Sequence, residues 1–128
     1  MSKAEREKGK RGEREFAGLC REHGYTARRG QQYSGANGDA DVVGLPDIHV
    51  EVKRVERLDL LGAMAQSKAD AKAGEMPIVA HRRNNAEWLI TMAAEDWFAL
   101  YDEYYSGREL KAAEEVILDY LNNEEVKR

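Results

Sequence analysis

The sequence predicts an α/β fold in which a mixed central sheet is flanked by helices on both faces, with an added C-terminal helix. Helix-like and strand-like hydrophobic periodicities alternate along the chain, which is typical of a sheet covered by helices. The chain has 128 residues, 42% of them hydrophobic and 34% charged. That length is enough for one domain with a core of its own and too short for two full domains.

The first half of the chain predicts one helix followed by three strands. Residues 4–23 contain good helix formers and an apolar stripe that includes Phe16 and Leu19, and Gly24 follows as a C-terminal cap. A polar, glycine-rich surface loop is expected over residues 30–38. The expected strands are residues 25–29, 39–43 and 48–53, and a turn at 44–47 joins the last two.

The second half predicts one helix, two strands and two further helices. Their expected ranges are 58–73, 78–81, 88–92, 94–105 and 110–121. We place a helix break at Ser106-Gly107, so that residues 1–107 form the main domain and residues 108–128 an amphipathic, acidic helix and tail. Apolar stripes around Trp97 and Leu110 predict core packing or dimer contacts, which makes the C-terminal helix a candidate protein–protein contact.

The net charge of -4 is distributed unevenly along the chain. Residues 1–33 carry nine basic and five acidic side chains, whereas residues 95–128 carry four basic and ten acidic ones. Because salt screens distant charges, an acidic tail does not prevent a basic face elsewhere from meeting phosphates. The composition is therefore compatible with a nucleic acid as partner of the first 94 residues.

Several classes of protein are excluded by what the sequence lacks. Its N-terminus is charged and no apolar run reaches the ~18 residues of a membrane span, so we expect a cytoplasmic protein without membrane contact. The single cysteine, Cys20, agrees with a reducing compartment. Zinc-ligand spacings, phosphate-binding loops and nucleophile elbows are absent, which argues against most nucleophilic and dinucleotide-cofactor enzymes.

A carboxylate pair is expected on the hairpin of residues 39–53. If residues 45–47 form a three-residue loop, Asp41 lies opposite Glu51, with Cβ atoms ~5 Å apart. Such a pair is costly without a cation, and Mg²⁺ favours oxygen ligands. Lys53, on the same face, could orient or deprotonate an attacking water, although Glu-Val-Lys is also common on surface strands. Asp39 is expected on the same face of the strand as Asp41 and is the alternative metal ligand.

The helix of residues 4–23 adds a third carboxylate. Glu13 lies about 60° around the helix from Phe16, near the centre of the apolar stripe, whereas Glu15 lies on the other flank and is expected to face water. A carboxylate on the buried side of a helix is expensive. We therefore expect Glu13 to reach inward to a polar site.

Three segments together resemble the PD-(D/E)XK nucleases, and within them the Holliday-junction-resolvase-like group with its small phage members. The segments are GEREF (12–16), GDADVV (38–43) and HVEVK (49–53). The resemblance implies a restriction-endonuclease-like fold and a Mg²⁺-dependent endodeoxyribonuclease, with Mn²⁺ as a substitute metal, that acts on branched or recombination-type DNA. It also implies a phage or bacterial intracellular protein. The literal dipeptide Pro46-Asp47 lies in the turn and is interpreted as a decoy.

By that resemblance, Glu13, Asp41 and Glu51 match the metal-binding carboxylates, Lys53 matches the motif lysine, and Gln66 a glutamine of the following helix. Basic and amide side chains are candidates for DNA contacts, with a merely solvated surface as the alternative: Arg11, Arg14, Arg28, Arg29, Gln31, Gln66 and Arg82. His49 shares the face of Glu51 and is expected to be hydrogen-bonded or to support the site.

A homodimer would bring two sites to a four-way junction. The alternatives are a non-catalytic nucleic-acid-binding or scaffold protein of this fold, or an interaction module.

Overall fold

The computed structural model describes residues 2–31 and 40–127. The chain forms two compact units, Met1–Ala93 and Ala94–Arg128. The first unit contains, in its described part, the helices α1 (Lys3–Glu22) and α2 (Leu60–Asp70) and a five-stranded sheet. The second unit is the helix α3 (Ala94–Lys127).

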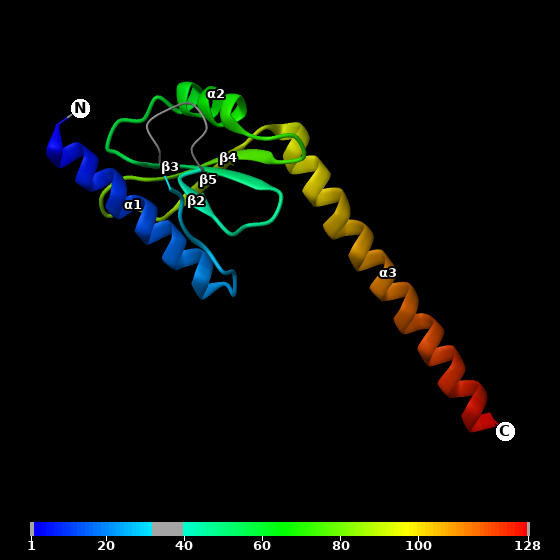
Figure 1. The fold of residues 1–128 in the computed structure, drawn as a ribbon. Helices are drawn as coiled ribbons and strands as arrows, with labels where there is room; N and C mark the ends of the chain where they lie inside the picture. Colours follow the sequence, from blue (N-terminus) through cyan, green and yellow to red (C-terminus); the bar gives the residue numbers. More distant parts are fainter. Residues whose placement is uncertain (1, 32–39, 128) are drawn as a thin grey trace. The chain divides into compact units, whose positions relative to one another are not determined.

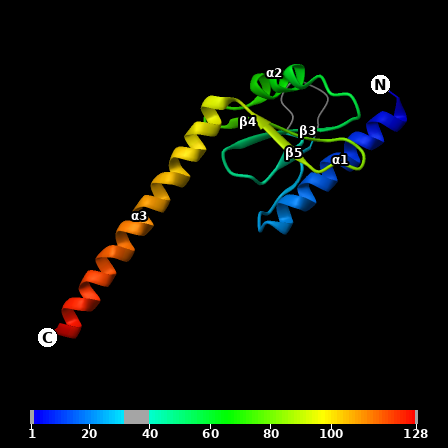
Figure 2. The ribbon, with the colours of Figure 1, turned by 180° about the vertical axis from the view of Figure 1, so that it is seen from behind.

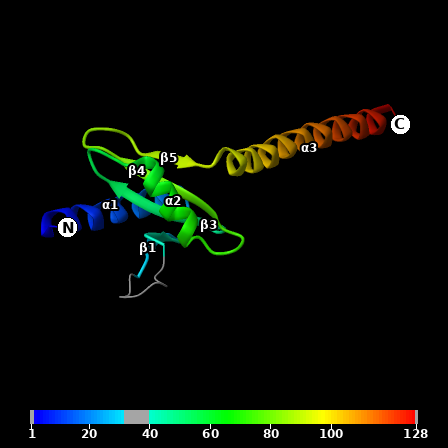
Figure 3. The same cartoon turned by 90° about the horizontal axis from the view of Figure 1, so that it is seen from above.

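The sheet is mixed, as the sequence predicts, and its strands follow chain order from one edge to the other. The strands are β1 (Arg28–Arg29), β2 (Val42–Val43), β3 (Ile48–Arg54), β4 (Met76–Arg82) and β5 (Leu89–Met92). Only β3 and β4 pair in parallel, while the other neighbours are antiparallel. These two strands lie side by side at the centre of the sheet (Figure 3). The helix α2 provides the crossover that a parallel pair requires.

Helices cover both faces of the sheet, which confirms the predicted layering. Phe16 and Cys20 of α1 belong to a buried cluster with Val50 of β3 and Ile78 of β4, whereas Val79 belongs to a second cluster with α2. Because successive strand residues point to opposite faces, α1 and α2 pack on opposite sides. Figure 1 shows α1 and α2 on either side of the sheet, and Figure 2 shows the same arrangement from behind.

The hairpin between β2 and β3 has the register that a three-residue loop predicts. Val42 pairs with Val50, and the backbone N–H of Ile48 donates to the Leu45 carbonyl at 3.3 Å. Gly44 has φ 111° and packs so closely on Thr26 that a Cβ atom there would overlap the Thr26 carbonyl oxygen. Glycine is therefore required at this corner, and the register carries Asp41 towards Glu51.

The main differences from the predicted elements lie in α2 and α3. The helix α2 begins two residues later than predicted, because the Asp59 side chain accepts the Gly62 N–H at 3.0 Å and caps it. The predicted break at Ser106-Gly107 is wrong, since α3 is continuous from Ala94 to Lys127. Glycine costs only about 1 kcal/mol in a helix interior, which the good helix formers on both sides offset.

The unit formed by α3 exposes its large apolar side chains. Trp97 and Tyr101 stack on each other with ring centroids 5.1 Å apart, and both are exposed, as are Leu110 and Ile117. Among the helices of the described residues, none is long and apolar enough to cross a membrane.

A buried hydroxyl fastens α2 to the sheet. Ser67 is fully buried, and its Oγ donates to the Ile78 carbonyl at 2.9 Å. We expect Ser67→Ala to lower the free energy of unfolding by about 1–2 kcal/mol, since it leaves a buried carbonyl without its donor. Gln66→Ala, at the exposed neighbouring position, is the control and should change it by less than ~0.5 kcal/mol. Urea unfolding measures both, and equal effects would contradict the assignment.

Candidate functional site

A pocket of about 730 Å³ lies between the N-terminal half of α1 and the C-terminal end of β3. Glu13, Asp41, Glu51 and Lys53 all line it. The structure therefore brings the four predicted catalytic side chains to one cavity, although they come from three separate segments of the chain. The register of the β2–β3 hairpin and the docking of α1 on the sheet produce this convergence.

Asp41 and Glu51 form the centre of this site. The Oδ2 atom of Asp41 accepts the backbone N–H of Val52 at 2.8 Å, and the Asp41 N–H donates to the Val50 carbonyl at 3.0 Å. These bonds hold Asp41 just before β2, where its carboxyl group interacts with that of Glu51. Two buried carboxyl groups that interact in this way disfavour the doubly ionised state.

Burial changes the protonation of both carboxyl groups. Desolvation raises the pKa of Asp41, against the lowering effect of the Val52 N–H. Desolvation, with the neighbouring Asp41 charge, raises the pKa of Glu51 to about 7, although Lys53 opposes the rise. A divalent cation would reverse these shifts because it favours the ionised forms. The pair thus has the electrostatics of a cation site.

Lys53 and Glu13 approach this pair from different sides. The Nζ atom of Lys53 lies 3.9 Å from Oε1 of Glu51. Glu13 reaches inward, as predicted, with only 14% of its side chain exposed, and its Oε2 accepts the Arg29 Nε–H at 2.7 Å. Arg29 also lines the pocket. The Glu13 charge is therefore compensated by Arg29, which the sequence suggested only as a DNA contact.

Most of the other residues suggested for DNA contacts lie outside the pocket. Arg29 is the exception, since it lines the cavity. Five others are exposed elsewhere on the first unit: Arg11, Arg14, Arg28, Gln31 and Gln66. Their exposure leaves them accessible to a large ligand.

The alternative metal ligand Asp39 lies outside the described residues. Asp47 occupies the β2–β3 turn with φ 64° and does not line the pocket. Its place agrees with the interpretation of Pro46-Asp47 as a decoy.

Basic residues that the sequence analysis did not select also line the pocket. Arg6, Lys8 and Lys10 come from the first turns of α1, and Arg54 follows Lys53 on β3. Positions 6, 10 and 13 recur at helical spacing, so the face that carries Glu13 also predicts Arg6 and Lys10. The position of Arg54 depends on the approach of β3 to α1, for which the sequence contains no local signal.

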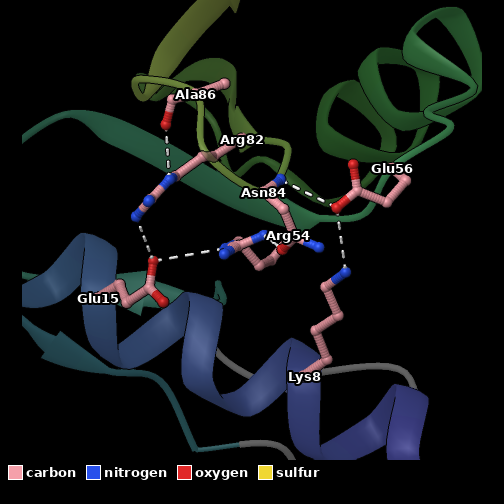
Figure 4. Close-up of polar contacts among 7 residues, drawn as sticks. All are labelled: Lys8, Glu15, Arg54, Glu56, Arg82, Asn84 and Ala86. Carbon is pink, nitrogen blue, oxygen red and sulfur yellow. Dashed lines mark hydrogen bonds and ion pairs between the residues drawn. The ribbon is translucent and has the colours of Figure 1, made fainter.

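An ion-pair network ties α1 to the ends of β3 and β4 beside the pocket (Figure 4). Glu15 is exposed, as expected, and its Oε2 pairs with Arg82 at 3.0 Å and with Arg54 at 3.5 Å. Lys8 pairs with Glu56 at 3.6 Å. Arg82, suggested as a DNA contact, is thus engaged with α1. These pairs position the basic rim of the pocket.

One ring nitrogen of His49 has no hydrogen bond within the described part of the chain. Its side chain is buried, and its Nε2 atom has no hydrogen-bond partner among the described residues. The Oε2 atom of Glu51 lies 3.9 Å from this Nε2 atom. His49 therefore lies beside the site with an unsatisfied nitrogen.

The fold of this chain is similar to that of a solved structure. No family model matches the chain, and no curated protein matches it. A solved structure of Archaeoglobus fulgidus Hjc, a Holliday junction resolvase from an archaeal hyperthermophile, is similar with a TM-score of 0.47 and 22% identity. The likeness covers 66% of this chain and 72% of that one.

Proposed function

We propose that this protein is a Mg²⁺-dependent endodeoxyribonuclease that hydrolyses phosphodiester bonds of branched or recombination-type DNA. The observation that carries the proposal is the convergence of Glu13, Asp41, Glu51 and Lys53 on one pocket. The choice of DNA as substrate follows the resemblance of the three motifs to PD-(D/E)XK nucleases. The proposal also treats the charged pocket rim as the DNA-facing surface.

The residues present fit a hard divalent ion. Asp41 and Glu51 are interacting carboxyl groups that line one pocket, and burial makes them costly to ionise without a cation. They would hold Mg²⁺, or Mn²⁺ in its place, with Glu13 as a further oxygen donor. When bound, the ion supplies Lewis-acid polarisation of the phosphate and lowers the pKa of water.

Lys53 has a different role. Its ammonium group lies 3.9 Å from Glu51 and lines the same cavity, so it faces the space in which a phosphate would bind. There it would orient the attacking water and stabilise negative charge that develops on the phosphoryl oxygens. The ion pair with Glu51 holds the amine near the carboxylate pair.

The basic rim of the pocket would contact the DNA backbone. The cavity is lined by five acidic and six basic side chains. The basic ones are Arg6, Lys8, Lys10, Arg29, Lys53 and Arg54. Lysine and arginine contacts to phosphates give salt-dependent affinity without sequence preference. The exposed Arg11, Arg14, Arg28, Gln31 and Gln66 would extend this surface. In a homodimer, for which the apolar side chains of α3 are candidate contacts, two such surfaces would meet one junction.

The second candidate is a non-catalytic DNA-binding or scaffold protein of the same fold. The basic rim favours DNA binding in either case, so binding alone does not separate the two. The buried carboxylate pair favours catalysis, because a scaffold has no need of two acids that destabilise each other.

Cleavage of a panel of end-labelled DNAs tests the proposal. A four-way junction, a flap, a nicked duplex and a linear duplex are incubated with Mg²⁺, Mn²⁺ or EDTA. We expect cleavage with either metal, none with EDTA, and the highest rate on a branched substrate. Glu51→Ala should abolish cleavage, while Glu22→Ala on the exposed part of α1 is the control. Gel shifts without cleavage of any substrate would support the scaffold alternative instead.

A further inference from the structure

A second group of potential metal ligands lies on the opposite side of Glu51 from Lys53. His49 and Glu51 are alternate residues of β3, and Asp70 is the last residue of α2. Each offers one ligand atom, and these atoms all lie within 4.8 Å of one another. The two Glu51 oxygens point to different neighbours, with Oε1 3.9 Å from Lys53 Nζ and Oε2 3.9 Å from His49 Nε2.

The imidazole of His49 is an independent sign of a ligand. Its side chain is 6% exposed, and Nε2 has no hydrogen-bond partner among the described residues. A buried polar atom without a partner costs about 1–3 kcal/mol. That cost disappears when the lone pair of Nε2 binds a metal ion, and Nε2 is the atom that faces Glu51.

A neighbouring carboxylate supports the tautomer that this role requires. The Oε1 atom of Glu75 lies 3.9 Å from the Nδ1 atom of His49 and is held by the Lys72 N–H at 2.8 Å. Histidine ligands commonly direct their second ring N–H towards a carboxylate, which leaves the other nitrogen free for the metal. Glu75 lies on the Nδ1 side, so Nε2 is the ligating atom.

The site is accessible and needs only a small contraction. His49, Asp70 and Glu75 line a cavity of about 100 Å³ that has room for water, whereas Glu51 lines the large pocket on its other side. Ligands about 2.0–2.1 Å from a tetrahedral ion lie roughly 3.3 Å apart. Atoms at the full 4.8 Å separation must therefore approach by about 1.5 Å, which a rotation of the exposed Asp70 side chain can supply.

We propose that His49, Glu51 and Asp70 bind a first-row transition-metal ion of the Zn²⁺ class. One imidazole and two carboxylates form a mixed nitrogen and oxygen donor set, which suits Zn²⁺ or Co²⁺ better than Mg²⁺. The site shares Glu51 with the proposed nuclease centre but does not depend on DNA cleavage. It differs from that centre in using His49 and Asp70 as ligands in place of Asp41 and Glu13.

Metal titration of the full-length, EDTA-stripped protein tests this site. Co²⁺ binding is followed by its visible absorption, Zn²⁺ affinity is measured by competition, and the His49 ring nitrogens are observed by NMR. We expect Asp70→Asn and His49→Gln to lower the Co²⁺ and Zn²⁺ affinities by about 10–100-fold. The His49 Nε2 resonance of the wild type should shift on Zn²⁺ addition.

Two controls separate this site from the nuclease centre. Asp102→Asn, an exposed carboxylate of α3, should bind Co²⁺ like the wild type. Asp41→Asn should lose cleavage and still show the Zn²⁺-induced shift of the His49 Nε2 resonance, so the two proposals fail independently. If His49→Gln does not fold, the exposed Asp70 variant decides. Unchanged affinity in Asp70→Asn, or an unmoved His49 Nε2 resonance, would overturn the proposal.

Discussion

Asp41→Asn is expected to lower the DNA cleavage rate by at least about 100-fold while the protein remains folded. Asparagine keeps the size of the side chain and its ability to accept the Val52 N–H, which Asp41 accepts at 2.8 Å. It removes one of the two negative charges that would bind the divalent ion. The effect should therefore appear in cleavage and in Mg²⁺ affinity, with little change in thermal stability.

Asp47→Asn is the matched control for this substitution. Asp47 belongs to the literal Pro-Asp dipeptide, but it sits in the turn at φ 64° and does not line the pocket. Asparagine tolerates that left-handed conformation, so the variant should fold and cleave normally. Loss of cleavage in Asp47→Asn together with full activity in Asp41→Asn would show that Asp47, and not Asp41, belongs to the active site.

Glu51→Gln is expected to stabilise the metal-free protein at pH 8. Burial raises the pKa of Glu51 from its ordinary value of 4.5 to about 7 in the folded state. The folded protein therefore holds this proton more tightly than the unfolded chain, and stability falls as the pH rises from about 4.5 through 7. At about 1.4 kcal/mol per pKa unit, the ionised carboxylate costs on the order of 3 kcal/mol above that range.

The expected change is large enough for thermal unfolding to resolve. In a domain of this size, each kcal/mol added to the free energy of unfolding raises Tm by about 4–8 °C. Glu51→Gln should therefore raise Tm by about 5 °C or more at pH 8. At pH 4.5 most of this difference should vanish, because Glu51 is then protonated in the folded wild type. Glu22→Gln, an exposed residue of α1, should leave Tm unchanged at both pH values. A lower Tm for Glu51→Gln at pH 8 would contradict the burial of an uncompensated charge.

Added metal should act on the wild type in the same direction. An ion that binds the folded state stabilises it by mass action, so Mg²⁺ should raise the wild-type Tm at pH 8. Glu51→Gln should respond less, since it has lost one of the ligands. The pH dependence and the metal response thus report on the same carboxylate.

The alternation of β3 shows why much of the site was predictable. Ile48, Val50 and Val52 face the core, so Glu51 and Lys53 had to share the other face, and the turn composition set the register with β2. The apolar stripe of α1 likewise predicted that Glu13 turns inward. Local patterns therefore located the carboxylates before any tertiary contact was known.

The partners of these residues were not predictable in the same way. Arg29 pairs with Glu13, and Arg54 and Arg82 pair with Glu15, across separations of 16 to 67 residues. Such contacts depend on how α1 docks on the sheet, which no short spacing in the sequence encodes. Asp70 approaches His49 and Glu51 for the same reason, because the crossover helix ends beside β3.

The continuous helix α3 illustrates a different kind of error. Ser106-Gly107 has the composition of a break, and turn propensity alone predicts two helices there. In the structure the residues on both sides keep helical geometry through it. A single glycine is a weak interruption when its neighbours favour the helix.

The most direct test of the proposed nuclease is the single-turnover cleavage of a labelled four-way junction by the wild type and by Lys53→Ala. Both are measured with saturating Mg²⁺ and with EDTA. We predict metal-dependent cleavage by the wild type and a rate at least about 100-fold lower for Lys53→Ala, which should still show the Mg²⁺-induced rise in Tm. Cleavage that persists in EDTA, or that is equally fast in Lys53→Ala, would contradict the assignment of this pocket as the active site.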